Sequence, residues 1–163
     1  MRYIIDGYNV INSSDMFLSP TLEGKRNKLL EFIQFNSPHG GLKNSVTIVF
    51  DYKSKNPYES NDYNNKYRMG DIEIVFSGGI ISADDIIVKI VDESQNPYEI
   101  TIITNDKGIR RRISPSGAKY EAVEVFLSKE FKQKNIKRVW EHCDKSETEQ
   151  INEELVELWL KKQ

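Results

Sequence analysis

The first nine residues of the chain, MRYIIDGYN (Met1–Asn9), combine a strand with a candidate site. Residues 2–5 predict a short buried β-strand, and a carboxylate, Asp6, follows it directly. Gly7 would let the chain turn sharply at that point, and Asn9 could then face back toward the end of the strand. The stretch therefore raises the question of what a charged group does at the end of a buried strand.

The pattern of an apolar run followed by a turn or a capped helix recurs along the chain. Strands are expected at 3–5, 45–50, 72–79 and 99–104, helices after the N-caps Thr21 and Ser82 and at 107–113, and an edge strand with a further helix after 117. Strands that are apolar along their length and alternate with helices are typical of a parallel sheet covered on both faces. The predicted fold class is therefore α/β, a three-layer α/β/α sandwich around a mainly parallel sheet.

Two segments have a different character. Residues 52–70 are polar and have no clear period, which predicts a surface loop. Near the C-terminus, Ile151, Leu155, Leu158 and Trp159 fall on one face of a predicted helix. We expect one domain at residues 1–135 and a helical C-terminal extension at 136–163 that packs on the same domain.

Composition narrows the classes of function. The net charge is −2, so the chain as a whole does not attract nucleic acid, although Lys107–Arg112 (KGIRRR) is a local basic cluster. With one cysteine, Cys143, and two histidines, His39 and His142, the chain has too few of the usual ligands for a zinc site. A single cysteine also fits a reducing cytoplasm. No apolar run is long enough to span a membrane, and no signal peptide is visible. Any bound metal would have to be held by carboxylates, as Mg²⁺ or Mn²⁺ are.

Carboxylates gather at the predicted strand ends. Asp6, Asp51 and Asp106 lie at or just after three strands, while Asp84 and Asp85 open a helix after another. Each one alone reads as an ordinary turn or cap residue. In a parallel sheet, however, all of these ends lie along one edge, where ligands bind. An acidic rim would be self-repelling, and one or two divalent cations would relieve the repulsion, activate water and neutralise a phosphate.

Four motifs in a fixed order carry a family resemblance. They are DGYN at Asp6–Asn9, VFD at Val49–Asp51, VFSGGIISADD at Val75–Asp85 and TNDKGIRR at Thr104–Arg111. In this order they resemble the NYN domains of the PIN-like nuclease superfamily, most closely the YacP-like branch, over residues 1–131. The resemblance implies a PIN-like fold and a metal-dependent ribonuclease. Members of this branch include ribosome-associated endoribonucleases that cut messenger RNA.

The resemblance, together with the pattern, also assigns site residues. The expected catalytic residues are Asp6, Asp84, Asp85, Asp106 and Asn9, with Mg²⁺ or Mn²⁺ held by Asp6, Asp84 and Asp106. The expected substrate contacts are Lys107, Arg110, Arg111, Tyr8, Thr104 and Ser82, with Tyr8 and Tyr52 as candidates for stacking on bases. Asp51 is expected to have a supporting role, and Ser82 stands where Thr is commoner but keeps the hydroxyl cap.

Two other functions compete with this interpretation. One is a non-catalytic module that binds RNA or the ribosome with the same fold, although a binder of polyanions gains nothing from clustered carboxylates. The other is a phosphatase of the haloacid-dehalogenase type, which also begins with an aspartate at a strand end. That chemistry requires a second aspartate two residues later, where this chain has Tyr8. Metal-dependent endoribonuclease is therefore the predicted function, with RNA as partner and the cytoplasm as location.

Overall fold

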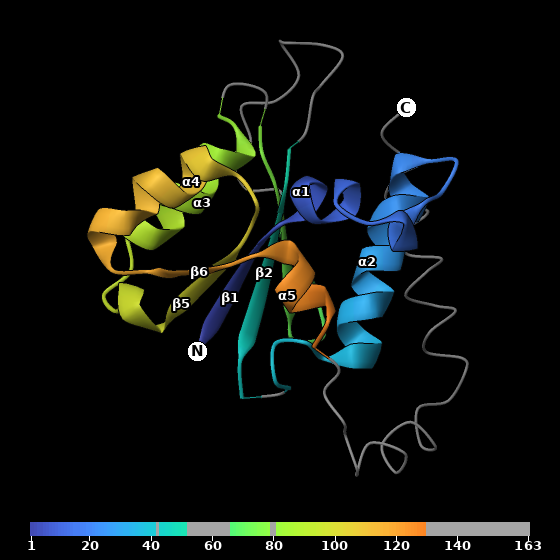
Figure 1. Ribbon diagram of the computed structural model, residues 1–163, viewed down its shortest axis with the longest axis horizontal. Helices are drawn as coiled ribbons and strands as arrows, with labels where there is room; N and C mark the ends of the chain where they lie inside the picture. Colours follow the sequence, from blue (N-terminus) through green and yellow to red (C-terminus); the bar gives the residue numbers. More distant parts are fainter. Residues whose placement is uncertain (42, 52–65, 79–80, 130–163) are drawn as a thin grey trace. The chain divides into compact units, whose positions relative to one another are not determined.

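In the computed structural model of the chain, the residues described are 1–41, 43–51, 66–78 and 81–129. Contacts between Cα atoms divide the chain into one compact unit at Met1–Phe131 and a second at Lys132–Gln163. The fold reported below is that of the first unit (Figure 1). The predicted C-terminal helix, and Tyr52 as a stacking residue, lie outside the described residues.

One sheet organises the described part of the chain. Its strands are β1 (Arg2–Asp6), β2 (Ser45–Phe50), β3 (Lys66–Met69), β4 (Ile72–Phe76), β5 (Ile100–Ile103) and β6 (Lys119–Glu121). Their order across the sheet is β3-β4-β2-β1-β5-β6. Every neighbouring pair is parallel except β3 and β4, which are antiparallel. The predicted mainly parallel sheet is confirmed.

Helices cover both faces of this sheet (Figure 1). The helices are α1 (Gly7–Asn12), α2 (Leu22–Asn36), α3 (Ala83–Asp92), α4 (Lys107–Ile113) and α5 (Val123–Leu127). On one face α1, α2 and α5 pack against β-strand residues such as Ile5 and Ile48. On the other face α3 and α4 pack against residues such as Ile4 and Val49. Successive side chains of a strand point to opposite faces, so Ile4 and Ile5 each enter a different core.

The chain changes direction beside β1. From β1 it passes to β2 and β4 on one side, and then crosses to β5 and β6 on the other. The carboxyl ends of the parallel strands point toward the α1 end of the molecule in Figure 1. In open α/β sheets, ligands bind outside the carboxyl ends of strands at such a switch point. This topology places the end of β1, between β2 and β5, at the centre of the candidate site.

The start of α1 differs from the expectation of a sharp turn at Gly7. The helix begins at Gly7 directly after β1, with Asp6 as its N-cap. A Cβ atom on Gly7 would lie 2.3 Å from the ring of Phe50 in the neighbouring strand. Glycine is therefore required by the close approach of α1 to β2, because no larger residue fits between the backbone and that ring.

Two further expectations were wrong in detail. The strand β3 (Lys66–Met69) lies within the stretch 52–70 that was expected to be a loop. In this edge strand Tyr67 and Met69 alternate with Lys66 and Arg68, and an alternation of only four residues after a polar stretch is too short to reveal a strand.

Along α2, the N-cap Thr21 is confirmed. The apolar residues of this helix from which the sequence predicts its buried face are Leu22, Leu29, Leu30, Ile33 and Phe35. Of these, however, Leu22 and Phe35 are 56% and 75% exposed and do not belong to the core.

Candidate active site

Asp6 lies at the centre of the sheet edge that is formed by the carboxyl ends of the parallel strands. It ends β1 and is only 8% exposed. Its Oδ1 accepts a hydrogen bond from the backbone N–H of Asn9 at 3.3 Å, which caps α1. Its Oδ2 accepts a hydrogen bond from the hydroxyl of Thr104, at the end of β5, at 3.1 Å. Both carboxylate oxygens of this buried acid are therefore held in place by neighbouring elements.

Burial also changes the acidity of Asp6. The pKa of Asp6 is raised from 3.8 to about 6, chiefly by desolvation, while the hydrogen bonds from Asn9 and Thr104 act in the opposite direction. The negative charges of Asp84 and Asp106 contribute to this rise. These three carboxylates, from three separate segments, therefore act on one another electrostatically at the same edge of the sheet.

Thr104 links Asp6 to Asp106. Its side chain is fully buried, and its hydroxyl both donates to Asp6 and accepts from the backbone N–H of Asp106 at 3.0 Å. Asp106 in turn caps α4, because its Oδ1 accepts from the backbone N–H groups of Gly108 and Ile109. A fully buried hydroxyl engaged in this way positions the two acids, which differs from the direct substrate contact expected for Thr104.

Asn9 is also committed to the framework of the site. Its Oδ1 accepts a hydrogen bond from the backbone N–H of Asn105 at 2.8 Å. The bond joins α1 to the loop between β5 and α4, on the two sides of the switch point. The amide oxygen thus fixes the distance between the two segments that carry Asp6 and Asp106. The catalytic role expected for Asn9 stays a prediction.

Asp84 lies at the start of α3, where Ser82 is the N-cap as expected. It is half-buried, and burial raises its pKa, followed by the negative charge of Asp106. The guanidinium of Arg112 lowers the same pKa, while Asp85 and Asp51 raise it. Asp84 therefore belongs to the same group of charges as Asp6 and Asp106.

Asp85, the next residue, faces a different environment. It is exposed, and its Oδ2 accepts from the Ser82 hydroxyl at 2.8 Å while its Oδ1 pairs with Arg112 at 2.8 Å. The Ser82 hydroxyl in turn accepts from the backbone N–H of Asp85 at 3.2 Å, as in a capping box. The hydrogen bond from Ser82 and the contact with Arg112 lower the pKa of Asp85. Both of its oxygens thus have partners within the protein.

Asp51 follows β2 and completes the acidic edge. Its Oδ1 accepts a hydrogen bond from the hydroxyl of Ser77, which follows β4, at 2.7 Å. Its charge also contributes to the raised pKa of Asp84. Ser77 was not among the expected site residues, although its place directly after a strand, in VFSGG, is the same signal that revealed Asp51.

The oxygen donors at the acidic edge decide whether a divalent cation could bind there. Within the described residues, no group of three or more Asp, Glu, His or Cys side chains converges closely enough to form a ready-made metal site. The donors at the edge are nonetheless all oxygens, and Mg²⁺ keeps several of its water molecules while using one or two carboxylates. The set fits a hydrated Mg²⁺ or Mn²⁺ bound in part through water, because a cation would relieve the repulsion among Asp6, Asp84 and Asp106.

The basic residues of α4 are distributed over several positions. Lys107 and Arg111 are exposed, and neither has an ion pair or side-chain hydrogen bond among the described residues. Arg110 donates to the carbonyl of Thr104 at 3.0 Å and stacks over the ring of Tyr120 at 4.5 Å. Arg110 therefore braces the site from within, whereas Lys107 and Arg111 remain candidates for contact with RNA.

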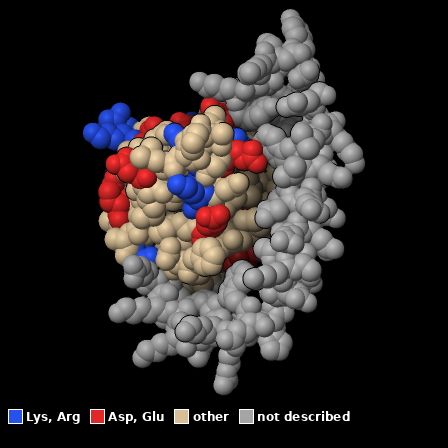
Figure 2. Space-filling view, turned by 90° about the vertical axis from the view of Figure 1, so that its right-hand side faces the viewer, with Lys and Arg blue, Asp and Glu red and all other residues tan. Residues whose placement is uncertain are grey.

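Tyr8 lies beside the acidic edge but packs inward. It is half-buried, and its ring meets that of Phe50 edge-on with the centroids 5.3 Å apart. On the face shown in Figure 2, acidic and basic side chains are interspersed over the described surface, with uncharged surface between them. Attraction of a polyanion would therefore come from cations beside the site and not from a large basic area on that face.

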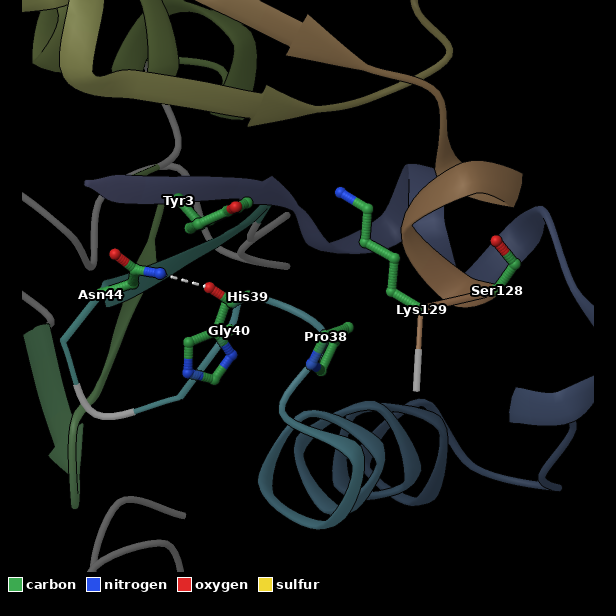
Figure 3. A pocket seen from close by; sticks show the side chains of 7 residues that line it. All are labelled: Tyr3, Pro38, His39, Gly40, Asn44, Ser128 and Lys129. Atoms are coloured by element: carbon green, nitrogen blue, oxygen red, sulfur yellow. Dashed lines mark hydrogen bonds between the residues drawn. The ribbon is translucent and has the colours of Figure 1, made fainter. Parts of the chain in front are cut away.

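A cavity of about 510 Å³ lies at the opposite, amino end of the strands. It is lined by Tyr3, Pro38, His39, Gly40, Asn44, Ser128 and Lys129, of which Asn44 donates a hydrogen bond to the carbonyl of His39 (Figure 3). Burial lowers the pKa of His39, and Asp71, whose Oδ2 is 3.8 Å from its Nε2, opposes this shift. Neither ring nitrogen of His39 has a hydrogen-bond partner in the described part of the chain. The cavity is thus separate from the acids.

Comparisons with known proteins agree on fold and family. The model of the YacP-like NYN domain matches residues 3–162, so the resemblance extends beyond residue 131, where it was expected to end. A crystal structure of Rae1 (YacP) from Bacillus subtilis is similar, with 21% identity, a TM-score of 0.55 and coverage of 99% of this chain and 91% of that chain. A crystal structure of its tryptophan-to-leucine mutant is also similar, with 20% identity, a TM-score of 0.57 and coverage of 77% of this chain and 72% of that chain. No curated protein matched the chain.

These likenesses at 20–21% identity establish the α/β fold. None of the helices in the described ranges has the length and apolar character needed to cross a membrane. The family model, by contrast, covers nearly all of the sequence and includes each of the four motifs. This protein therefore belongs to the YacP-like NYN domain family.

Proposed function

We propose that the protein is a metal-dependent endoribonuclease that hydrolyses phosphodiester bonds of RNA. Membership of the NYN family supports a nuclease-type, RNA-related function. The observation that carries the finer proposal is the buried carboxylate of Asp6 at the switch point, joined through the Thr104 hydroxyl to the segment of Asp106. A self-repelling group of acids at a ligand-binding edge is what a cation-dependent hydrolase requires.

Within this proposal the acids have distinct roles. Asp6, Asp84 and Asp106 would hold a hydrated Mg²⁺ or Mn²⁺ ion, with Asp51 in support. When bound, the cation supplies positive charge beside the phosphate and makes a water molecule more acidic. Asn9 and Thr104 keep the two sides of the switch point at a fixed separation through their hydrogen bonds. Lys107 and Arg111 would contact the RNA backbone on either side of the cut.

The substrate and its setting follow from the family. Messenger RNA cut in association with the ribosome is the activity that resemblance to the YacP-like branch implies, and we propose it here. We also propose a cytoplasmic location, which the single cysteine supports. The proposed domain plan, a nuclease domain at 1–135 with a helical extension at 136–163, is compatible with the compact unit at Met1–Phe131.

Cleavage of a messenger RNA transcript tests the proposal directly. The purified chain is incubated with the transcript in Mg²⁺, in Mn²⁺ and in EDTA, with and without ribosomes. We expect cleavage with either cation and none in EDTA. Asp6→Asn and Asp106→Asn should each abolish cleavage, because each removes one negative charge from the proposed ion site. Asp92→Asn is the matched control, since Asp92 is an exposed acid at the far end of α3 from Asp84.

Two outcomes would contradict the assignment. Cleavage that survives Asp6→Asn would show that a different site or a contaminant is responsible. Tight binding of RNA without cleavage, in both cations and with ribosomes present, would favour the alternative of a non-catalytic binding module.

A further inference from the structure

The basic run of α4 contains one residue whose position differs from that of the others. Arg112 is the last arginine of KGIRRR, and its Nη2 lies 2.8 Å from Oδ1 of Asp85 at the start of α3. The pair therefore bridges two helices that pack on the same face of the sheet. The other cations of the run either point to solvent or brace the Thr104 carbonyl.

Arg112 also lies within electrostatic reach of the acids. The Asp85 carboxylate that it contacts belongs to the residue next to Asp84 in the first turn of α3, so the guanidinium lies at the same helix start as one of the acids of the proposed ion site. A phosphate that approaches Asp6, Asp84 and Asp106 is repelled by them, so a cation at this rim would offset the repulsion. Arg112 is half-exposed, with 46% of its side chain accessible, and is open to a ligand.

Most N–H donors of the Arg112 guanidinium are not used within the described residues. The guanidinium carries five N–H donors in a planar fork, and among the described residues its side chain hydrogen-bonds to Asp85. Asp85 is itself fixed by two hydrogen bonds with Ser82. Its Oδ2 accepts from the Ser82 hydroxyl, and its backbone N–H donates to the same hydroxyl. A fork held on one side by a fixed carboxylate is prepared to bind phosphate oxygens with its remaining donors.

We propose that Arg112 binds the phosphate at the cleavage position and that Asp85, anchored by Ser82, positions Arg112 for this contact. The inference rests on the proposed nuclease function, and it changes the expected role of Asp85 from a catalytic residue to a positioning residue. The substrate feature recognised is a non-bridging phosphate oxygen. Lys107 and Arg111 then contribute general attraction to the RNA backbone.

Kinetics with a modified substrate test the contact. A short RNA with one mapped cleavage position is prepared with a phosphate or an uncharged methylphosphonate there. Arg112→Ala should lower kcat/KM on the phosphate substrate by about 10- to 100-fold, as for loss of a charged hydrogen bond. The methylphosphonate should lower kcat/KM of the parent at least about tenfold more than it lowers kcat/KM of Arg112→Ala. The variant is less sensitive because it has already lost the contact between Arg112 and the phosphate oxygen. Arg111→Ala, with the same charge change on the same helix, should leave the methylphosphonate penalty unchanged.

Substitutions of Asp85 separate positioning from metal binding. Asp85→Asn should lower kcat/KM in the parent but have little further effect in Arg112→Ala, because the two residues act as a unit. The Mg²⁺ concentration for half-maximal rate should not change. A large additional loss in the double variant, or a higher Mg²⁺ requirement for Asp85→Asn alone, would make Asp85 a metal ligand and overturn the proposal.

A binding measurement keeps the inference independent of cleavage. In the Asp6→Asn background, the salt dependence of binding to single-stranded RNA is compared with and without Arg112→Ala. The slope of log K against log salt is negative, and its magnitude should fall by about 0.7, the value for one phosphate contact on a single strand. An unchanged slope would overturn the contact of Arg112, whereas absence of cleavage by the parent would overturn the nuclease function alone. Similar thermal unfolding of all variants shows that the fold is retained, since exposed ion pairs contribute little stability.

Discussion

At the scale of single residues, Asp6 determines how the site responds to pH. Its pKa is raised from 3.8 to about 6, chiefly by burial. A carboxyl with a raised pKa stabilises the fold fully below its unfolded pKa, and this contribution is lost as the pH rises through about 6. At neutral pH the ionised group therefore costs about 3 kcal/mol of folding free energy in the absence of a cation.

Removing this charge should stabilise the protein. We expect Asp6→Asn to raise the free energy of unfolding by about 1–3 kcal/mol at pH 8 without divalent cations, and the gain to vanish near pH 4. Urea unfolding of parent and variant at both pH values measures the difference. Asp92→Asn, which changes an exposed charge, should show no such gain. A variant that is less stable than the parent at pH 8 would contradict the buried, repelled state of Asp6.

Divalent cations should reverse that order of stability. An ion that binds the folded state at concentration c stabilises it by RT ln(1 + c/Kd), so the melting temperature rises with the logarithm of the ion concentration once this exceeds the Kd. Mg²⁺ or Mn²⁺ is therefore expected to raise the Tm of the parent but not that of Asp6→Asn, and EDTA should return the parent to its original value. Equal shifts in both proteins would mean that the ions bind elsewhere.

At the scale of secondary-structure elements, the junction between β1 and α1 is packed so closely that it leaves no space for a side chain. The helix begins without an intervening loop, and Gly7 meets the ring of Phe50. We expect Gly7→Ala to destabilise the fold by about 1–3 kcal/mol, as overpacking does, because a Cβ atom would force the ring to move. A substitution at Gly70, where a Cβ atom would meet nothing within 4 Å although φ is positive, provides a contrast in which only the backbone is strained.

The sequence predicted the elements that carry apolar runs and caps. Strands β1, β2, β4 and β5 and the N-caps Thr21 and Ser82 were found where expected, since burial and capping leave local signals. The helix at Gly7 was missed because Gly7 was interpreted as a sharp turn, although Asp6 caps this helix locally. The edge strand β3 was missed because its alternation of polar and apolar residues is only four residues long.

The candidate site shows the same division. Strand ends predicted which acids share one edge, and the mutual effects of Asp6, Asp84 and Asp106 on their acidity agree with that placement. Which partner each side chain chooses could not be predicted, because it depends on tertiary geometry. Asp85 pairs with Arg112, and Thr104 is buried between two acids, although nothing in their spacing indicates either contact.

At the scale of the whole molecule, the two ends of the sheet respond to pH in opposite directions. His39, at the amino end, has a lowered pKa because it is buried. Its contribution to stability is present above its unfolded pKa of about 6.5 and is lost as the pH falls from there through the lower pKa of the folded state. Asp6, at the carboxyl end, loses its contribution as the pH rises. Acid conditions should therefore reduce the stability contributed at the amino end of the sheet, through His39. Neutral conditions without cations should reduce the stability contributed at the carboxyl end, through Asp6.

Replacement of the histidine tests this division. We expect His39→Phe to be more stable than the parent by about 1–2 kcal/mol at pH 7, because two unpaired buried nitrogens are removed, with a larger gain at pH 5. Urea unfolding at the two pH values provides the measurement. A gain that shrinks on acidification would indicate that protonated His39 pairs productively with Asp71, 3.8 Å away.

The position of β1 in the middle of the sheet has a consequence for the order of folding. Its two neighbours come from distant parts of the chain, since Ile5 pairs with Ile48 on one side and with Ile103 on the other. Until β5 has docked, β1 is an open edge and Asp6 has no hydroxyl from Thr104. A growing or truncated chain that stops before residue 104 thus lacks Thr104 and Asp106 and leaves the acidic edge incomplete. The arrangement of Asp6, Thr104 and Asp106 therefore requires the pairing of β1 with β5, so the proposed activity should appear only after that pairing has formed.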